Sequence, residues 1–592
     1  MLIRRYPSYY RADVLGLKPG SYIIKIVSET LKEELTTSFI NVNAYDRSGF
    51  TWAKGSPTYG VGAGAYNLDG TLKLGAKVIY VTEATKNKIK MTIKGNLLTG
   101  IAAITQQIKD KNNIGPVAIR IIGQVSLEDL SCPDMKSAYA IGVKEASQVT
   151  IEGVGDDATL NAGVAVFRSS SIEIRNLGLM LWGGGRDGDG VSLKEARGAW
   201  VHNNDVFYGL AGHDNDQAKG DGSMDIKDDS QYVTISYNHF YDSGKMSLCG
   251  MKSETGENWI SYHHNWFDHS DSRHPRIRTM SVHVYNNYYD GVAKYGVGVT
   301  SGGEAFVEKN YFRHCKYPMM ISGQGTDLIT GGTFSGEDGG MIKSFNNYIE
   351  DETSYKIYSE ENKNDFDAYE ALTRDEMVPS DITVVQGGSS YSNFDVNENL
   401  MYDYVPLDPE DVPKVVMANA GRVEGGDFKY EFTEEDDLDY GVNEDLMNKL
   451  RDYVTEVVSI GNGDEADYND DSGSEEQEKL VITSTAEHNF SIHGLTSVYF
   501  EIEGNVKEKD AIEYNGLSLT AYLKLESHTK IVFTVSHEAK LTLVTDSTTS
   551  NFNLDDETVK TDSSGVTTVD ISSGKHIITK ANTGNVFYIK VE

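Results

Sequence analysis

Short apolar segments recur between residues 116 and 350, and an asparagine follows each of them. The spacing is 22 residues from Asn265 to Asn287 and 23 from Asn287 to Asn310, and the other gaps are longer, as insertions would make them. A period in the low twenties with β-branched and aromatic strands predicts a β-solenoid, in which asparagine side chains bond from coil to coil and suit left-handed turns. The aligned asparagines are Asn176, Asn204, Asn238, Asn265, Asn287, Asn310 and Asn347.

The segments that flank this repeat predict a closing helix and a tail. Residues 99–111 place isoleucines at helical spacing, so we expect a helix that caps the open end of the stack. Residues 351–440 are irregular and acidic, and are expected to pack along the outside of the coils and return toward one end. A second helix is predicted over residues 443–458, with Asn443 as its N-cap.

The two ends of the chain have a different, alternating pattern. Residues 1–45 alternate like strands around a Lys-Pro-Gly turn and resemble part of a fibronectin type III module; an N-terminal β-cap on the next domain, residues 46–458, is an equal alternative. Residues 459–478 are predicted to form an acidic linker. Residues 479–592 alternate throughout and predict an antiparallel β-sandwich, whose place after a linker resembles that of carbohydrate-binding modules.

Charge and cysteine content limit the possible partners. The net charge of −35 makes nucleic acid and anionic membranes poor partners. The sequence contains no run of 18 apolar residues, so no membrane-spanning helix is predicted. The three cysteines, Cys132, Cys249 and Cys315, have unrelated spacings and do not predict a disulfide framework. No apolar signal-peptide region follows Met1, and the chain is expected to begin inside a domain.

Four segments carry the chemistry. They are "GGGRDGDGVSL" (183–193), "GDGSMDIKDDSQYVTISYNHF" (220–240), "GKMSLCGMKSETGENWISYHHNWF" (244–267) and "SRHPRIR" (272–278). Together, in order and in spacing, they resemble polysaccharide lyase family 1, the pectate lyases, whose Arg-x-Pro-x-x-Arg signature is met at Arg273, Pro275 and Arg278.

The resemblance implies a right-handed parallel β-helix with an N-terminal capping helix. With the C-terminal antiparallel β-sandwich expected from the alternation, the whole chain is predicted to be all-β. It also implies a secreted or cell-surface enzyme, expected to be a monomer, that cleaves polygalacturonate or pectin by calcium-dependent β-elimination. That reaction removes the C5 proton beside a carboxylate. A hard Ca²⁺ ion bridging protein and substrate carboxylates would stabilise the charge that develops.

The family's site residues map onto seven positions. The calcium ligands correspond to Asp187, Asp189, Asp221 and Asp225. Asp221 departs from the glutamate that is common in relatives, and its shorter reach leaves Asp228 or Asp229 as substitutes. Arg273 corresponds to the catalytic base, and Lys245 and Arg278 to substrate-binding residues. Lys227, two residues after Asp225, is expected to reach the substrate as well. The resemblance gives no catalytic role to His263, His264, His274 or His283, which are expected to pack on coil turns.

Three other functions compete with this hypothesis. A hydrolase of polygalacturonase type would use carboxylates such as those in "GHDND" (212–216) and at 228–229, but has no use for the arginine signature. A pectin lyase acts on uncharged methyl esters, for which an aspartate cluster is unnecessary. A non-catalytic carbohydrate-binding β-helix is disfavoured by the intact Lys245, Arg273 and Arg278.

Overall fold

The computed structural model describes residues 3–28, 32–127, 140–183, 188–334, 336–457, 459–460, 481–483, 485–495, 497, 499–515, 517–546, 551–561 and 564–592. The chain forms two compact units, residues 1–470 and residues 471–592, which are described separately. Cys249 and Cys315 are free and buried, whereas Cys132 lies outside the described residues. In these ranges no helix combines the length and apolar character needed to cross a membrane.

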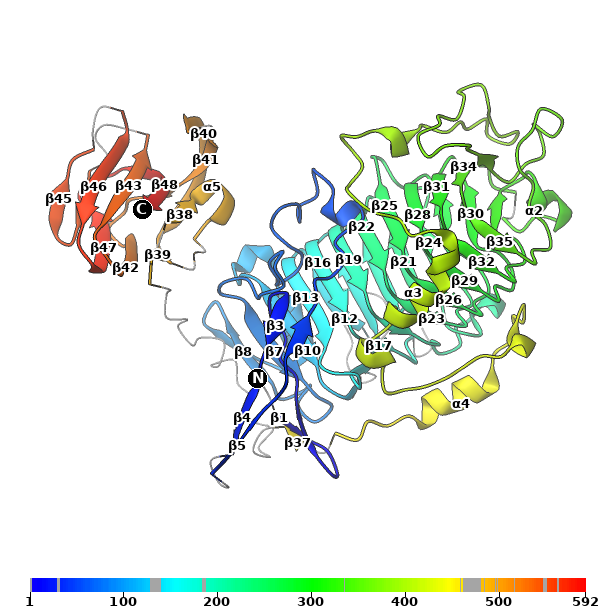
Figure 1. Cartoon of the computed structure of the whole chain (residues 1–592), viewed down its shortest axis with the longest axis horizontal. Coiled ribbons are helices and arrows are strands. Elements are labelled where there is room, and N and C mark those ends of the chain that lie inside the picture. The colour runs from blue at the N-terminus through cyan, green and yellow to red at the C-terminus, as the bar shows by residue number, and fades with distance from the viewer. Residues whose placement is uncertain are drawn as a thin grey trace. The chain divides into compact units, whose positions relative to one another are not determined.

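Three parallel sheets of eleven, nine and eight strands form the β-helix of the first unit (Figure 1). Sheet A contains β7 (Lys77–Val81), β10 (Val117–Ile121), β13 (Ser147–Gly153), β16 (Ser170–Arg175), β19 (Arg197–His202), β22 (Gln231–Ser236), β25 (Trp259–His263), β28 (Ser281–Tyr285), β31 (Glu304–Glu308), β34 (Met341–Phe345) and β36 (Tyr369–Glu370). Sheet B contains β11 (Gln124–Ser126), β14 (Thr159–Asn161), β17 (Gly178–Leu179), β20 (Asp205–Val206), β23 (His239–Tyr241), β26 (Trp266–Asp268), β29 (Tyr288–Asp290), β32 (Tyr311–Arg313) and β35 (Tyr348–Glu350). Sheet C contains β12 (Ala140–Lys144), β15 (Gly163–Phe167), β18 (Val191–Lys194), β21 (Met224–Lys227), β24 (Leu248–Cys249), β27 (Arg276–Arg278), β30 (Val297–Thr300) and β33 (Met319–Ile321).

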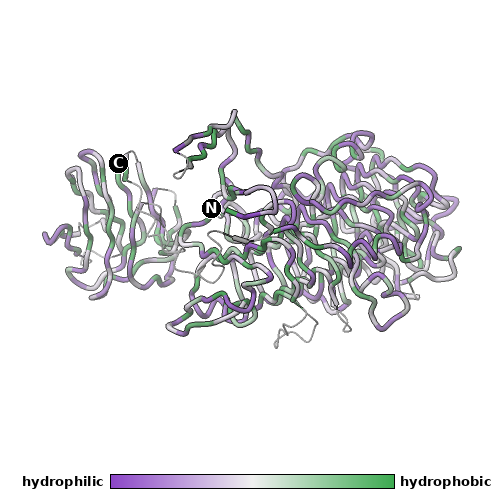
Figure 2. Tube along the Cα trace, turned by 90° about the horizontal axis from the view of Figure 1, so that it is seen from below, coloured by the Kyte–Doolittle hydropathy of each residue, from purple (hydrophilic) through white to green (hydrophobic). Residues whose placement is uncertain are grey.

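The chain visits the three sheets in turn, one strand of each per coil, which makes a right-handed parallel β-helix and confirms the predicted fold. Alternation along each strand separates a core face from an outer face. In β21, Met224 and Ile226 are fully buried in the core, while Asp225 and Lys227 lie on the other face. Hydrophobic and hydrophilic stretches accordingly alternate along the trace (Figure 2).

An asparagine ladder joins the coils at the turn between sheets A and B. Each side-chain amide donates to the side-chain oxygen of the next asparagine, at 2.9–3.1 Å, and the ladder runs through Asn204, Asn238, Asn265, Asn287, Asn310 and Asn347.

Two details of the predicted ladder were wrong. First, Asn176 was predicted to belong to the ladder, but its side-chain amide donates to the carbonyls of Gly153 and Gly155 instead. The Asn204 side-chain oxygen accepts from the backbone N–H of Leu177, the residue after Asn176. The second is the backbone conformation. The residue before each ladder asparagine, such as Tyr237 or His264, has positive φ, so the asparagine itself is free to point inward.

The N-terminal end of the β-helix is covered by short elements: β8 (Lys90–Ile93), β9 (Asn96–Thr99), α1 (Ile101–Gln107) and η2 (Asp110–Asn112). The short helix η1 (Phe50–Trp52) lies instead against middle coils of sheet A, where Phe50 N–H donates to the Ser261 hydroxyl and Thr51 N–H to the Thr234 hydroxyl, each at 3.0 Å. The predicted capping helix is α1, whose Ile101 and Ile104 join the main core.

Residues 1–45 form antiparallel strands: β1 (Ile3–Arg5), β2 (Tyr10–Ala12), β3 (Gly20–Tyr22), β4 (Lys25–Ser28), β5 (Glu33–Thr36) and β6 (Ile40–Val42). The first of them contacts the β-helix directly, because buried Arg4 donates to the Val154 carbonyl at 2.9 Å and to Asp157 at 3.0 Å. β1 also pairs with β37 (Ser459–Ile460), so these two residues of the predicted linker form a strand. The relation to a fibronectin type III module stays a prediction.

After the last coil the chain returns along the outside of the β-helix (Figure 1). This tail contains η4 (Phe394–Val396), η5 (Pro409–Asp411), α3 (Val412–Asn419), η6 (Val423–Gly425), η7 (Glu434–Asp436) and α4 (Glu444–Asp452), whereas α2 (Thr326–Ile329) lies earlier, between β33 and β34. From residue 407 to residue 423 the tail passes coils in reverse order: Leu407 N–H donates to Asn286 and Val423 N–H to Asn176, each at 2.8 Å. It then turns back, and Leu438 N–H donates to the Gly291 carbonyl. Asn443 caps α4 by accepting from Leu446 N–H.

The second unit contains two antiparallel sheets around a core of its own. Its elements are β38 (Ala486–Asn489), α5 (Phe490–His493), β39 (Glu501–Glu503), β40 (Asn505–Tyr514), β41 (Leu517–Lys524), β42 (Lys530–Val535), β43 (Ala539–Thr545), β44 (Phe552–Leu554), β45 (Glu557–Val559), β46 (Val566–Ile571), β47 (Gly574–Lys580) and β48 (Asn585–Val591). Buried side chains of both sheets, such as Leu541 and Ile578, meet in that core, which confirms the predicted sandwich.

Candidate active site

The outer face of sheet C gathers most of the residues that the motifs single out. β18, β21, β24 and β27 are consecutive neighbours in this sheet, so residues far apart in sequence lie one coil apart. Asp189 precedes β18, Asp225 and Lys227 lie in β21, Lys245 precedes β24, and Arg273 precedes β27.

Lys227 lies between two buried carboxylates. Its Nζ is 2.5 Å from Asp189 and 3.2 Å from Asp225, whose other oxygen accepts from Leu248 N–H at 2.9 Å. Burial raises the pKa of Asp189 to about 7, and the neighbouring charge of Asp225 contributes to that rise. Burial would lower the pKa of Lys227, but Asp225 and Asp189 raise it overall. Negative charge is therefore crowded at this point, and one ammonium group balances two carboxylates.

A second charged group lies beside the first. Lys245, 8% exposed, lies 2.8 Å from Asp221 and 3.4 Å from Asp216. Burial acts to raise the pKa of Asp221, but the hydrogen bond from Lys245 outweighs it and the pKa is lowered. The Arg273 guanidinium is 3.7 Å from Asp216, a long ion-pair contact, and is 20% exposed, so it can be reached from solvent.

Arg278 is held by a protein carboxylate. It forms a two-point contact with Glu337, at 2.7 Å from Nη2 and 3.2 Å from Nε. Arg276 and Lys252 also contact Glu337, at 3.1 and 2.9 Å. Burial opposes ionisation, yet the hydrogen bonds from Arg278 and Thr300 hold the pKa of Glu337 well below its usual range. Arg278 therefore has the geometry for a carboxylate, and Glu337 is the carboxylate it binds here.

The remaining predicted residues are placed differently. Asp187 lies outside the described residues. Asp228 pairs with Lys194 at 2.8 Å, and Asp229 accepts from Thr255 N–H at 2.6 Å, so both face the loop around residue 255 rather than Asp189.

The four histidines are buried on the coils. The pKa of each is lowered by burial, for example to about 3 in His274, whose Nδ1 lies 2.9 Å from the Tyr295 carbonyl. None of the four is in contact with Arg273 or Lys245 in the described contacts.

The donor set fits a hard cation. Asp189, Asp221 and Asp225 offer carboxylate oxygens, the ligands that Ca²⁺ prefers, and a lysine ammonium already lies where positive charge is needed. In the described chain these three carboxylates do not converge within 4.8 Å of one another, as two other groups do. The lysines lie between them, so a cation would have to displace Lys227 from at least one carboxylate.

Sequence reasoning missed Asp216, Glu337 and Arg276 as members of this surface. Asp216 lies in η3 (Asn215–Gln217), where Asp214 and Gln217 form a capping box, so the local sequence explains the turn but not its nearness to Lys245. Arg276 lies on the same face of β27 as Arg278, a period-two signal that was available. Glu337 belongs to a loop after β33, and no pattern places it against Arg278.

Comparison with known proteins agrees with the motifs. Residues 26–338, just over half of the chain, match the family model described as pectate lyase, and residues 484–589 match carbohydrate binding module 77. The chain is 32% identical over 216 residues to a pectate trisaccharide-lyase of Bacillus licheniformis, and 33% identical over 235 residues to pectate lyase B of Dickeya chrysanthemi. These matches cover 36% and 38% of this chain and span 60% of the length of each relative.

Among solved structures, pectate lyase II of Xanthomonas campestris is similar at 22% identity, with a TM-score of 0.41, over 65% of this chain and 99% of that one. The family match over residues 26–338 spans β4 to β33 and contains the whole charged surface of sheet C. The chain therefore belongs to the pectate lyase family.

Proposed function

We propose that this protein is a calcium-dependent pectate lyase that cleaves α-1,4-polygalacturonate by β-elimination and releases unsaturated oligogalacturonides. The observation that carries the proposal is the meeting, on one face of sheet C, of crowded carboxylates with Lys245 and an accessible Arg273. An acidic polymer needs such a local cationic surface on a chain whose net charge is −35.

The carboxylates are the proposed metal ligands. Asp189, Asp221 and Asp225 would hold Ca²⁺, with Asp187 as a further ligand. The bound ion would supply positive charge at the substrate carboxylate. Lys227 and Lys245, which lie beside these carboxylates, would also contact the substrate. Arg278 would bind a uronate carboxylate through two N–H groups, as it binds Glu337 in this structure.

Arg273 is the proposed base. It would accept the C5 proton, while the C5–H electron pair forms the C4–C5 double bond and the C4–O bond breaks to release the leaving chain. An arginine is ordinarily protonated because its pKa lies far above neutral pH, so the neutral form that can accept a proton is scarce. Arg276 and Arg278 are the cationic groups near Arg273: burial first, and then Arg278 and Arg273, lower the pKa of Arg276.

The direct test is product analysis on polygalacturonate. We expect the absorbance of an unsaturated product to appear with Ca²⁺ and to vanish in excess chelator. Reducing ends formed without that absorbance would identify a hydrolase, and full activity in chelator on methylated pectin would identify a pectin lyase. No turnover of any pectic substrate by the folded protein would leave a binding β-helix.

We further propose that the sandwich, residues 479–592, binds pectic polysaccharide and is dispensable for turnover. It has its own core, and the linker before it is acidic. A truncated chain ending near residue 460 should turn over soluble polygalacturonate like the full chain. A folded but inactive truncated chain would refute this division of roles, and an isolated sandwich that no pectic polysaccharide retards in an affinity gel would refute the binding role.

We also propose that the protein acts as a monomer outside the cell, where its substrate occurs. For residues 1–45 we favour a β-cap over a partial fibronectin type III module, because Arg4 is buried against Val154 and Asp157 of the β-helix. Deleting residues 1–45 should then lower the melting temperature of the β-helix, whereas an independent module would leave it unchanged.

A further inference from the structure

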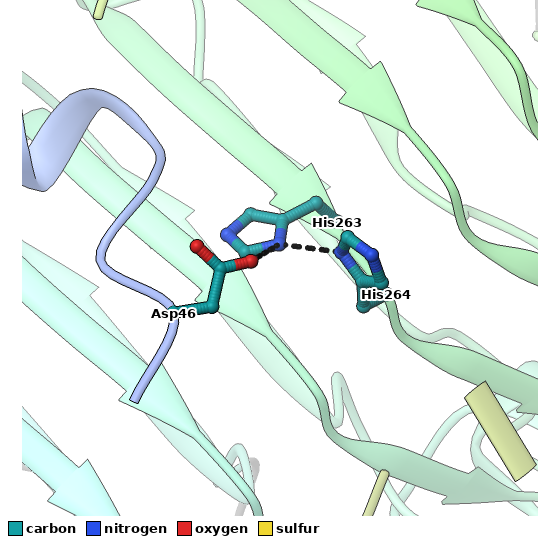
Figure 3. A group of neighbouring side chains, drawn as sticks. All are labelled: Asp46, His263 and His264. Carbon is teal, nitrogen blue, oxygen red and sulfur yellow. Dashed lines mark hydrogen bonds and ion pairs between the residues drawn. The ribbon is translucent and has the colours of Figure 1, made fainter. Parts of the chain in front are cut away.

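A second cluster of ligand-type side chains lies away from sheet C. Asp46 comes from the segment before η1, His263 ends β25 of sheet A, and His264 is the turn residue that follows. The three side chains point toward one another (Figure 3). The two Nδ1 atoms are 2.9 Å apart, and His263 Nδ1 is 4.0 Å from the Asp46 carboxylate.

The orientation of all three groups is fixed by neighbours. Asp46 accepts from Ser48 N–H at 3.0 Å, from the Ser48 hydroxyl at 2.8 Å and from the Tyr237 hydroxyl at 3.1 Å. The His264 ring stacks on Tyr237, and the His263 ring stacks on Tyr285. Outer partners that hold a carboxylate and two imidazoles in place are the usual support of a metal site.

The donor set is that of a transition metal. In zinc sites the ligand atoms lie about 2.0 Å from the ion, so tetrahedral neighbours are roughly 3.3 Å apart. The distances of 2.9 and 4.0 Å lie on either side of that value. Both histidines are buried, whereas Asp46 is 37% exposed, which leaves a solvent-facing position for a water ligand.

The charge of the cluster is unbalanced. Over the described ranges Asp46 forms no ion pair with lysine or arginine. Among the described residues its ion-pair contact is with the buried His263 imidazole, at 4.0 Å.

The other close group, Asp268, His269 and Asp290, has the opposite character. Arg313 pairs with Asp290, and His239 lies 2.8 Å from Asp268, so its carboxylates already have partners. A metal there would have to enter beside a fixed guanidinium. This contrast selects the cluster of Asp46, His263 and His264.

We propose that Asp46, His263 and His264 bind a divalent transition metal of the Zn²⁺ type, distinct from the calcium-type site on sheet C. The ion would join the segment before η1 to the turn after β25, two parts of the β-helix that are more than 200 residues apart. Its role would be to fix this segment on the coils. Neutral nitrogen ligands favour Zn²⁺ over Ca²⁺, which prefers oxygen.

The test is a titration of the full chain, stripped with EDTA, with Co²⁺ in the presence of excess Ca²⁺, which occupies carboxylate sites. We expect visible d–d absorbance that saturates at one Co²⁺ per chain and is displaced by Zn²⁺. Asp46→Asn and His264→Gln should abolish it. Tyr237→Phe, which removes a donor to Asp46, should weaken Co²⁺ binding about 10-fold.

The matched control is Asp555→Asn, which removes the partner of His576 in the sandwich, a histidine–aspartate pair at 2.6 Å with no second histidine. It should bind Co²⁺ like the parent chain. Zn²⁺ should also raise the melting temperature of the parent and control chains but not of Asp46→Asn. Absence of Co²⁺ absorbance in the parent, or its persistence in both folded Asp46→Asn and His264→Gln, would overturn the proposal. If those variants do not fold, an unchanged Co²⁺ affinity in Tyr237→Phe would overturn it.

Discussion

Asp189 and Asp225 on sheet C share one lysine, whereas Asp290 and Asp437 near sheet B share an arginine, and Asp437 also contacts two histidines. In the second group, here called the tail anchor, Arg313 contacts Asp290 and lies 2.6 Å from Asp437, and His269 and His314 contact Asp437 as well. Asp437 belongs to the returning tail, so the anchor joins the tail to the coils.

The pKa values of Asp437 and Asp268 follow this difference in balance, whereas that of Asp290 does not. Hydrogen bonds from Arg313 and His314 outweigh burial and lower the pKa of Asp437, and those from His239 and His269 do the same for Asp268. Burial raises the pKa of Asp290, with Arg313 opposing the rise. On sheet C, the pKa of Asp189 reaches about 7. Acidic groups that are paired hold the chain together, and acidic groups left crowded are suited to a metal and a substrate.

The largest effect is expected from Arg273, whose ion-pair contact with Asp216 is long, at 3.7 Å. Arg273→Lys keeps the charge but loses the planar fork, and should lower kcat at least about 100-fold, the scale of general base catalysis. Binding of polygalacturonate with calcium should persist. The measurements are kcat and a binding isotherm, with Arg168→Lys, exposed and paired with Glu145, as the control. Turnover near that of the parent chain would mean that the base lies elsewhere.

The second prediction contrasts the two acidic groups directly. Asp225→Asn should raise the calcium concentration for half-maximal activity by roughly tenfold or more, because affinity depends on the number of charged ligands. Asp290→Asn should leave that concentration unchanged but lower the free energy of unfolding by about 1–3 kcal/mol, since Arg313 loses one buried partner. Activity against free Ca²⁺ and urea unfolding measure the two. An equal effect of both variants on the calcium requirement would remove the distinction.

Much of the β-helix could be predicted from its sequence because each coil repeats a local rule. The ladder asparagines are buried and bond to their neighbours one coil away, so a period is visible. Asn176 was misplaced because it matches the pattern only by residue type. The Asn176 side-chain amide donates to the Gly153 carbonyl, and the ladder position in this coil is occupied by the next residue, Leu177.

The motifs likewise placed Asp225, Lys227 and Lys245, since these lie on or next to regular strands with a fixed register. Contacts supplied by loops were not predictable. Glu337 reaches Arg278 and Asp216 reaches Lys245 from irregular segments, whose path depends on side-chain packing rather than on a period. The partners of Asp46 were hidden for the same reason, since 217 residues separate it from His263 and no repeat relates them.

A smaller effect on catalysis is expected when Glu337 is changed, because this carboxylate is already paired with Arg278, Arg276 and Lys252. Glu337→Gln would release Arg278 for a substrate carboxylate and should lower KM about fivefold, the equivalent of ~1 kcal/mol, with little change in kcat. Steady-state kinetics on polygalacturonate would show it, with exposed Glu352→Gln as the control. A higher KM would instead mean that Glu337 orients Arg278 for binding.

The smallest effect is a pH dependence confined to the tail anchor. The hydrogen bond to Asp437 raises the pKa of His314 above its ordinary value of 6.5, so its stabilising contribution is complete below 6.5 and is lost as pH rises through the folded-state pKa. Asp437 stays ionised over that range because its pKa is lowered, and Arg313 continues to hold it. His314 is 34% exposed, so the loss should stay below about 1 kcal/mol.

Hydrogen exchange of the tail, corrected for intrinsic rates, measures this loss. The Leu438 amide, which donates to the Gly291 carbonyl at 3.1 Å, should exchange slightly faster as pH rises from about 6 to 9. His269 has a raised pKa and faces the same carboxylate, so His314→Gln should reduce the pH dependence and the double change with His269→Gln should remove it. Slower exchange of the Leu438 amide as pH rises would contradict the predicted loss of tail stability. It would mean that ionisation of the carboxylates, rather than of the histidines, determines how stably the tail is bound to the coils.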